Sequence, residues 1–432
     1  MSNKNPNKMG VVNLLPLPEL APPGNTVGAV GWMKNNLFSS PLNSILTLLG
    51  LALLYILIPP VLNWTMFDAV WSGGSEACKA NPDAACWTFA GEWWEFFIYG
   101  FYDKTQRWRV DLVLWALYVW VAFIIPENES RATRPTSTIL GFVIAGLSVL
   151  FISMAIKHNI PTMWLLIGAM VVIGTVLWAW GLKNGRSRVG IIVLVLFPII
   201  AYFLLGGGTL GLSVVNTNDW GGFLLTLVIA ITGIVASLPL GVLLALGRRS
   251  EMPVLRMVST LFIEFWRGVP LITVLFMASF MLPLFMSKGV TIDQLLRALI
   301  GVALFSSAYM AEVIRGGLQA IPKGQYEGAQ SLGLSFWKMM GLIVMPQALK
   351  IVIPGIVSTF IGLFKDTTLV LIIGLLDFLN SVQTATTNPE WSIKSVPYTG
   401  YVLVALVFWV HCYGMAWYSR HLENKLDTGH KR

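Results

Sequence analysis

Charged side chains interrupt the long apolar stretches in the second half of this sequence. They are Glu264, Arg267, Glu312, Arg315, Lys365 and Asp366. If these stretches cross a membrane, an ionisable group within them costs several kcal/mol unless it is paired or hydrated, so each is a candidate for function. Glu264 and Arg267 are three residues apart, as are Glu312 and Arg315, and residues at this spacing share one face of a helix. The two pairs predict either ion pairs that fix helix packing or a gate.

The composition indicates which elements must hold these charges. Of the 432 residues, 56% are hydrophobic and 12% are charged, whereas a soluble domain carries about 25% charged residues. Runs of about 20 apolar residues are long enough to cross a bilayer as helices. The sequence therefore predicts an all-α, polytopic membrane protein with about ten spans, near 42–62, 110–125, 138–156, 161–181, 189–205, 220–246, 256–285, 291–314, 347–375 and 397–418. In a straight helix over 256–285, Arg267 would lie roughly 16 Å from the inner end.

The net charge of +8 does not indicate nucleic-acid binding, because the basic residues lie in short loops between apolar runs. If both termini are inside, the inner loops hold most of the Lys and Arg residues, as the positive-inside rule requires. We therefore expect a flexible cytoplasmic tail over 1–41 without a signal peptide, and a second cytoplasmic tail over 421–432. Charges enter the spans only in the second half, so a domain boundary is expected at 216–219.

The loop 63–109 after the first span would face the outside. In an oxidising periplasm its two cysteines, Cys78 and Cys86, could form a disulfide, and two free thiols are the alternative. The stretch 87–109 is crowded with aromatic residues among charges. Because Trp and Tyr settle at the headgroup level, it predicts an interfacial segment, with a packed periplasmic hairpin as the alternative.

Polar residues return between two predicted spans, in the stretch IPKGQYEGAQSLGLSFWKMMGLIVMP. Pro322 suits the first turn of a helix, Gly333 can adopt the left-handed conformation that ends it, and Ser335 can cap a second helix. Pro346 would mark the start of the next span. The pattern predicts two short helices at the cytoplasmic surface, with Ala329 in a small contact face that could fit a groove on a soluble partner.

This stretch resembles the EAA loop of type I ABC-importer permeases, whose pattern is Glu-Ala-Ala, three residues, Gly, nine residues, Ile, one residue, Leu-Pro. Gly328 and Met345 replace an Ala and a Leu, and the matching positions are Glu327, Ala329, Gly333, Ile343 and Pro346. Gly328 should loosen the helix by about 1 kcal/mol relative to Ala. Because the family docks this loop into its ATPase subunits, the resemblance implies that 322–346 couples the chain to an ATPase dimer.

Neighbouring stretches narrow the resemblance to polar amino-acid permeases. These are EFWRGVPLITVLF (264–276), AYMAEVIRGGLQAIPKGQYEGAQSLGLS (308–335) and LFKDTTLV (363–370), and the match covers a five-span core over about 220–420. RWRVDL and the extra spans within 42–205 are similar to the long permease subunits of glutamate, glutamine, aspartate and asparagine or general L-amino-acid uptake systems.

The resemblance implies import from the periplasm across a bacterial inner membrane. It implies a second homologous permease and a periplasmic amino-acid-binding protein as partners. It places ATP and Mg on the separate ATPase, with no cofactor in this chain.

A free amino acid is a zwitterion, so its site needs a cation for the carboxylate, an acceptor for the ammonium group, and hydroxyls around them. Residues with this chemistry at suitable depth are Arg267, Ser306, Ser307, Lys365, Asp366 and Thr367. Arg267 could hold the carboxylate through two parallel hydrogen bonds.

Two other classes of membrane protein fit the sequence less well. An ion-coupled secondary transporter would show inverted repeats, but the first and last five spans differ in polarity and charge. A membrane-embedded enzyme needs a metal cluster or a nucleophile beside a base, and the four histidines form no metal-binding pattern. The phosphate loop G-x-x-x-x-G-K-[ST] is also absent. We therefore expect no enzyme, and ATP hydrolysis on another chain.

Overall fold

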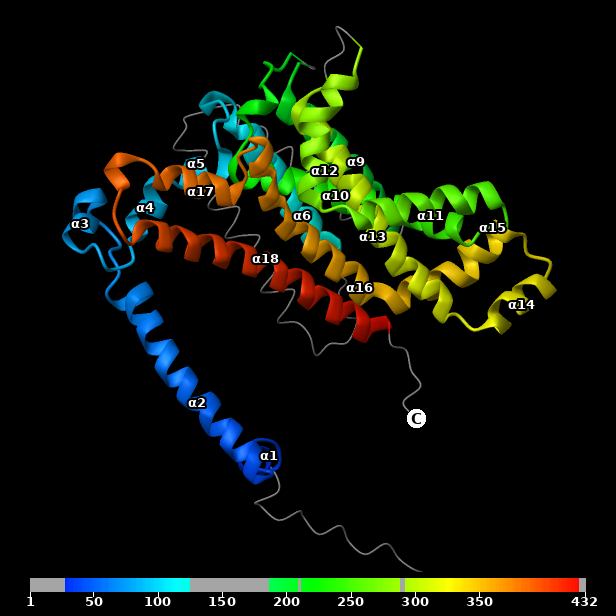
Figure 1. Cartoon of the computed structure of the whole chain (residues 1–432), viewed down its shortest axis with the longest axis horizontal. Helices are drawn as coiled ribbons and strands as arrows, with labels where there is room; N and C mark the ends of the chain where they lie inside the picture. The colour runs from blue at the N-terminus through cyan, green and yellow to red at the C-terminus, as the bar shows by residue number, and fades with distance from the viewer. Residues whose placement is uncertain (1–27, 125–185, 209–210, 288–291, 427–432) are drawn as a thin grey trace, which may run out of the picture. The chain divides into compact units, whose positions relative to one another are not determined.

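The computed structural model describes most of the chain (Figure 1), namely residues 28–124, 186–208, 211–287 and 292–426. Within these ranges the chain forms helices and three isolated bridges without a β-strand, so the predicted all-α class is confirmed. The predicted spans 138–156 and 161–181 lie outside the described residues. By its internal contacts the chain forms two compact units, Met1–Ala69 and Val70–Arg432.

The first unit contains one long apolar helix, α2 (Pro41–Leu62), with the short helix α1 (Gly28–Asn36) before it and the π-helical turn η1 (Asn63–Phe67) after it. Ser40 caps α2, since its side-chain oxygen accepts a hydrogen bond from the backbone N–H of Asn43 at 3.2 Å. α2 matches the predicted span 42–62. The tail expected to be flexible is helical in part, because it includes α1.

The second unit is built around long helices from the second half of the chain. Here α13 (Gln294–Ala320) packs against both α10 (Gly222–Arg248) and α16 (Met345–Asp366), and α18 (Val396–Leu426) runs along α16 (Figure 1). Shorter elements connect or extend these helices: α11 (Pro253–Gly268), α12 (Leu271–Phe276), η4 (Met277–Met281), η5 (Leu282–Phe285), α14 (Lys323–Ser331), α15 (Phe336–Met339), η6 (Met340–Val344), η7 (Thr367–Ile373), α17 (Phe378–Thr386) and η8 (Pro389–Trp391).

Five helices among the described residues are long and apolar enough to cross a membrane, and they match five of the predicted spans. They are Pro41–Phe67, Gly222–Arg248, Gln294–Ala320, Phe336–Ile373 and Val396–Asn424. The predicted span 256–285 is not one straight helix, because its two halves meet at 102°. The backbone of Val269 is extended, as the residue before a proline prefers. The depth expected for Arg267 in a straight span therefore does not apply.

The predicted spans 110–125 and 189–205 correspond to α6 (Arg107–Ile124) and α9 (Arg186–Gly206). α6 starts with the charged stretch RWRVD, and the apolar stretch found among the described side chains of α9 is Leu196–Gly206. Neither helix is among the five long spans. The predicted number of about ten spans is therefore not confirmed.

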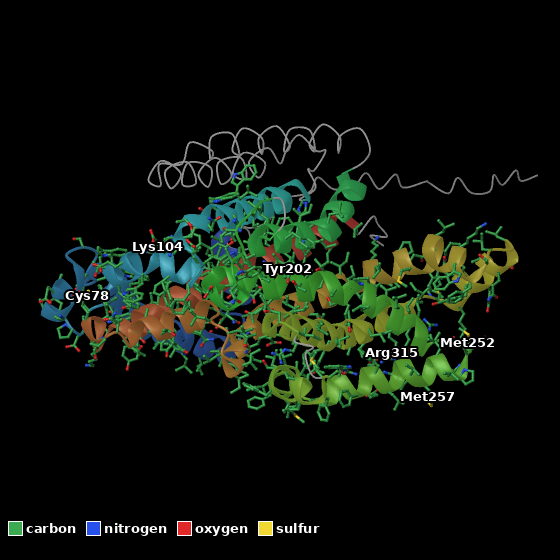
Figure 2. The ribbon with its side chains drawn as sticks, turned by 90° about the horizontal axis from the view of Figure 1, so that it is seen from above. Cys78, Lys104, Tyr202, Met252, Met257 and Arg315 are labelled. Carbon is green, nitrogen blue, oxygen red and sulfur yellow. A yellow bond between two sulfur atoms is a disulfide. The ribbon has the colours of Figure 1, made fainter. Side chains whose placement is uncertain are left out.

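A small folded region precedes α6 and consists of α3 (Gly74–Ala80), α4 (Trp87–Glu92), α5 (Trp94–Tyr99) and η2 (Lys104–Gln106). A disulfide joins Cys78 to Cys86, with the Cα atoms 5.7 Å apart, and Figure 2 labels Cys78 in this region. Phe89 is fully buried and contacts the rings of Phe97 and Trp391. These rings form a core, which favours the packed alternative for the aromatic stretch.

Buried polar contacts hold this region against the rest of the second unit. The guanidinium of Arg109 donates hydrogen bonds to the carbonyl oxygen and Oγ of Ser213, at 2.8 and 3.0 Å. The hydroxyl of Tyr102 donates to the carbonyl oxygen of Leu205 at 2.7 Å, and burial raises the pKa of Tyr102 to about 12, so this donor keeps its proton. The backbone N–H of Cys86 donates to Oγ1 of Thr399 in α18. The RWRVDL stretch thus has a structural role.

Gly222, at the start of α10, allows α5 to approach closely. Its φ is +62°, and a Cβ there would lie 2.4 Å from the carbonyl oxygen of Phe97. Because both the left-handed backbone and this clash oppose a side chain, we expect Gly222→Ala to lower the free energy of unfolding by about 2–3 kcal/mol. Thermal unfolding in detergent measures this. The control Gly414→Ala, in open space in α18, should be neutral or stabilising by up to about 1 kcal/mol; equal losses in both variants would contradict the prediction.

Candidate functional site

Two short helices, α14 and α15, form the polar loop between the long helices α13 and α16, as the sequence predicts. α14 ends in a reversal in which the N–H of Leu334 donates to the carbonyl oxygen of Ala329 at 3.2 Å. Gly333 provides this reversal with a φ of +68°, a conformation that glycine adopts without strain. The loop therefore has a fixed shape set by its own sequence.

Three details of this loop differ from the sequence prediction. Ala329 is 2% exposed and packs inside the chain, so it cannot form a contact face for a partner. The exposed face of α14 carries Glu327 and Gly328 instead. Ser335 occupies the N-cap position of α15, as predicted, but among the described contacts its side chain makes no capping hydrogen bond. Pro346 lies in the first turn of α16, but the span begins earlier, because the π-helical η6 joins α15 to α16 in one long span, Phe336–Ile373. Ile343 lies within η6.

A cluster of five charges joins α10, α11 and α13. Glu312 is at its centre and pairs with Arg248 at 2.7 Å, with Arg315 at 2.8 Å and with Arg267 at 3.5 Å. Glu264 pairs with Arg248 at 2.8 Å. The predicted pair of Glu312 and Arg315 is present, and Figure 2 labels Arg315. The predicted pair of Glu264 and Arg267 is wrong: both lie on α11, but each pairs with a residue of another helix.

Sequence reasoning missed Arg248, Arg249, Tyr309 and Tyr326. The guanidinium of Arg267 lies 5.7 Å from the ring centre of Tyr309, and Arg249 donates a hydrogen bond to the hydroxyl of Tyr326 in α14 at 3.1 Å. From the sequence, Arg248 and Arg249 at the end of α10 were expected only to add positive charge to an inner loop. Their position in the last turn of a helix, which favours cations, was the available signal.

Three predicted substrate residues are buried and use their hydroxyls locally. Ser306 donates to the carbonyl oxygen of Val302 at 2.8 Å, Ser307 to that of Leu304 at 2.7 Å, and Thr367 to that of Phe364 at 2.8 Å. Lys365 is exposed and Asp366 half-buried, and no hydrogen bond or ion pair is described for either side chain. Among the described contacts, no hydrogen bond or ion pair joins the side chains of two of the six predicted residues.

Two helices lose their regular α-helical form where the remaining charged candidates lie. α11 ends one residue after Arg267 and is followed by the bend into α12. α16 ends at Asp366 and continues as the 3-10 helix η7. α12 packs against η7, so the two irregular points belong to one neighbourhood. Irregular backbone within a membrane is tolerated where it is buried in protein or lines a cavity, and in transporters it often marks the binding site.

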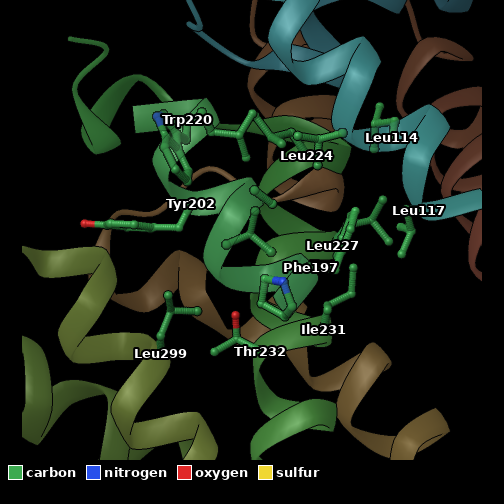
Figure 3. A pocket seen from close by; sticks show the side chains of 15 residues that line it. Leu114, Leu117, Phe197, Tyr202, Trp220, Leu224, Leu227, Ile231, Thr232 and Leu299 are labelled. Carbon is green, nitrogen blue, oxygen red and sulfur yellow. The ribbon is translucent and has the colours of Figure 1, made fainter. Parts of the chain in front are cut away.

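A separate cavity of about 50 Å³ lies between α6, α9 and α10 (Figure 3). Apolar side chains line most of it, among them Leu114, Phe197 and Leu227. The indole N–H of Trp220 is buried there without a hydrogen-bond partner among the described residues. A zwitterion would lose its hydration in this cavity without gaining partners. None of the predicted substrate residues lines it.

No group of three or more possible metal ligands is found among the described residues. Outside the spans, Asp377 is fully buried at the start of α17 and accepts hydrogen bonds from the backbone N–H groups of Leu379 and Asn380. Burial raises the pKa of Asp377 from 3.8 to about 6. Between these two values the folded chain holds the proton more tightly than the unfolded chain, so this carboxyl lowers stability as the pH rises through that window.

Replacing Asp377 by Asn should therefore stabilise the protein at neutral pH. We expect the gain in the free energy of unfolding to be roughly 1–3 kcal/mol larger at about pH 7.5 than at about pH 4, since the amide can still cap α17. Thermal unfolding of both proteins at the two pH values measures it. The control Asp103→Asn should show no such gain, because hydrogen bonds from Thr105 lower the pKa of Asp103. An unchanged pH dependence in Asp377→Asn would contradict the prediction.

Comparison with known proteins places these features among relatives. The family described as "Binding-protein-dependent transport system inner membrane component" matches residues 237–428. The Inner membrane amino-acid ABC transporter permease protein YhdY of Escherichia coli (strain K12) is 46% identical over 405 residues, which cover 94% of this chain and 95% of that protein. The Glutamate/glutamine/aspartate/asparagine transport system permease protein BztC of Rhodobacter capsulatus is 40% identical over 439 residues, which cover 95% of this chain and 96% of that protein.

A solved structure, titled "Crystal structure of an amino acid ABC transporter with histidines", aligns with 48% of this chain and 92% of its own chain. The sequence identity is 27% and the TM-score 0.42. The match to the two long relatives, unlike the match to this structure, extends over nearly the whole chain.

Proposed function

The chain belongs to the amino-acid ABC transporter permeases, and from this we propose that it carries polar or acidic L-amino acids from the periplasm to the cytoplasm. The 46% identity over 94% of the chain is the observation that carries this proposal. BztC, whose name gives glutamate, glutamine, aspartate and asparagine, supports the substrate class. As a permease subunit, the chain is a non-enzymatic membrane component. The relatives named above are ABC permeases, so the ion-coupled alternative gains no support.

An ATPase dimer that binds ATP and Mg would dock on the cytoplasmic loop around α14. The exposed Glu327 and Gly328, the Gly333 reversal and the continuous helical junction through Ile343 to Pro346 support this assignment. Because Ala329 is buried, its role is to anchor α14 to the spans rather than to touch the ATPase. A movement of the ATPase would then reach the spans through the packing of α14.

A periplasmic amino-acid-binding protein and a second, homologous permease would complete the transporter. The disulfide between Cys78 and Cys86 supports a periplasmic location for α3–α5, since such bonds persist in oxidising compartments. With α14 on the opposite, cytoplasmic side, both termini are proposed to be cytoplasmic in the inner membrane, in agreement with the distribution of Lys and Arg.

The substrate site is proposed at the bend between α11 and α12 and at the neighbouring change from α16 to the 3-10 helix η7. Arg267 would bind the carboxylate, because its one described ion pair, to Glu312, is long at 3.5 Å. Asp366 would accept the ammonium group, with Lys365 beside it. Ser306, Ser307 and Thr367 would support the walls of this site, since their hydroxyls already bind backbone carbonyls.

Purification of the tagged chain from its native host in mild detergent tests the assembly. Mass spectrometry of the co-purifying proteins should find a P-loop ATPase, a second permease and, when amino acid is added, a binding protein. Recovery of the chain without an ATPase under several detergent conditions would contradict the proposal.

A further inference from the structure

We propose that Arg248 and Glu312 form an ionic relay that transmits the movement of α14 to α10, α11 and α13 and so couples ATP hydrolysis to transport. This inference rests on the proposal that the ATPase docks on α14. It adds a transmission route made of five charged and two tyrosine side chains between the docking helix and the bend next to the proposed substrate site.

The first step joins α14 to the end of α10. Tyr326 of α14 accepts a hydrogen bond from Arg249 at 3.1 Å, and the guanidinium lies 5.6 Å from the centre of the ring. The same hydroxyl donates to the carbonyl oxygen of Leu318 in α13 at 3.1 Å. The Tyr326 side chain of α14 is therefore hydrogen-bonded both to Arg249 at the end of α10 and to α13. Ala329, one turn further along α14, is buried in the same apolar cluster as Ile314 and Leu318, so α14 cannot slide freely over α13.

The second step passes from Arg249 to its neighbour Arg248. The two nitrogens of the Arg248 guanidinium bind two carboxylates on two different helices, Glu264 of α11 at 2.8 Å and Glu312 of α13 at 2.7 Å. A planar guanidinium suits such a fork, because its N–H groups point in fixed directions. A displacement of the end of α10 must then either move both helices or break one of these bonds.

The third step reaches the bend of the broken span. Glu312 also pairs with Arg267, whose guanidinium faces the ring of Tyr309 at 5.7 Å. Arg267 is the last residue but one of α11, immediately before the 102° bend into α12. The side chain of Glu312 is 16% exposed, against 55% for Glu264, so water screens its bonds less. The charged side chains thus bond to one another across α10, α11 and α13. Such a continuous network is a physical route for coupling between distant sites.

Arg315 provides a matched control within the same cluster. It pairs with Glu312 three residues earlier on the same helix, and no hydrogen bond or ion pair from Arg315 to another helix is described. Arg248→Gln and Arg315→Gln therefore each remove one positively charged partner of the Glu312 carboxylate. Only Arg248→Gln cuts the contact between helices.

The experiment uses the complete complex, with ATPase and binding protein, reconstituted in liposomes. It measures the ATP hydrolysed and the labelled amino acid taken up in the same sample, as well as the ATPase bound per permease. We expect Arg248→Gln to keep its ATPase but to take up about 5- to 150-fold less amino acid per ATP, the range of typical coupling free energies. Arg315→Gln should stay within about twofold of the unmodified complex.

Equal ratios of uptake to hydrolysis in Arg248→Gln and Arg315→Gln would overturn the relay. If Arg248→Gln does not assemble, Arg248→Lys replaces it, because lysine keeps the charge but cannot span two carboxylates in the same fork. A normal ratio in Arg248→Lys would then overturn the relay. An unmodified complex that lacks bound ATPase, or that hydrolyses ATP without uptake, would instead contradict the proposed function itself.

Discussion

A complex that carries Glu327→Lys should lose its ATPase and nearly all ATP-driven uptake. Glu327 is exposed on α14, on the face that remains for a partner once Ala329 is buried. A reversed charge at a docking surface costs several kcal/mol when it meets a like charge, so the binding of the ATPase should weaken at least about tenfold. The amount of ATPase that co-purifies with the tagged chain, and the initial rate of uptake in liposomes, measure the loss.

Glu251→Lys is the control for this substitution. Glu251 is an exposed glutamate between α10 and α11, and its replacement reverses the same charge at a position outside α14. We expect it to retain both the ATPase and uptake. Normal co-purification and uptake in Glu327→Lys would remove Glu327 from the docking surface.

Asp366→Asn should slow amino-acid uptake while the complex remains assembled. Asp366 is half-buried at the end of α16, where we propose that its carboxylate accepts hydrogen bonds from the substrate ammonium. A hydrogen bond to a charged group contributes about 1.5–3 kcal/mol, so uptake at low substrate concentration should fall about 10- to 150-fold. Initial rates in liposomes over a range of substrate concentrations measure this, and the ATPase bound per permease monitors assembly.

The same substitution at an exposed position outside the spans, Asp219→Asn, is the control and should leave uptake unchanged. If the two variants have the same uptake kinetics, Asp366 does not contact the substrate. If Asp366→Asn loses its ATPase as well, its role is structural and the proposed site is wrong at this residue.

The polar loop was predictable because local rules determine it. A proline before α14 and a glycine that must adopt positive φ at its end are visible in any sequence, and both act over one helical turn. The five long spans were predictable for a similar reason, since each is a continuous apolar run. Ala329 was misplaced, because a small residue on an otherwise polar helix can face either a partner or the chain itself.

The charge cluster was not predictable, because it depends on how three helices meet. Arg248 finds Glu264 16 residues away and Glu312 64 residues away, and spacing within one helix favoured the pair of Glu264 and Arg267 instead. The bend at Val269–Pro270 was missed for another reason. Mean hydropathy is averaged over a window of many residues, so it remains high across a bend. The bend itself depends on one pair of residues, Val269 and Pro270.

In the extension before the permease core, local sequence patterns also could not predict which residues meet. The disulfide was one of two alternatives, since spacing alone does not bring two thiols together. The roles of Arg109 and Tyr102 needed the positions of Ser213 and Leu205, about a hundred residues further along the chain. In the sequence, an arginine within a charged motif resembles a binding residue. In the fold, Arg109 is buried and its hydrogen bonds to Ser213 hold two segments of the chain together.

Uptake of labelled glutamate by liposomes tests the central claim most directly. The liposomes contain either the purified complex or this chain alone, and each sample receives ATP inside the vesicles or a sodium or proton gradient across them. We predict uptake only for the complex, only with ATP and only when a binding protein is present. Uptake by the chain alone, driven by an ion gradient without ATP, would contradict the assignment to an ATP-driven importer.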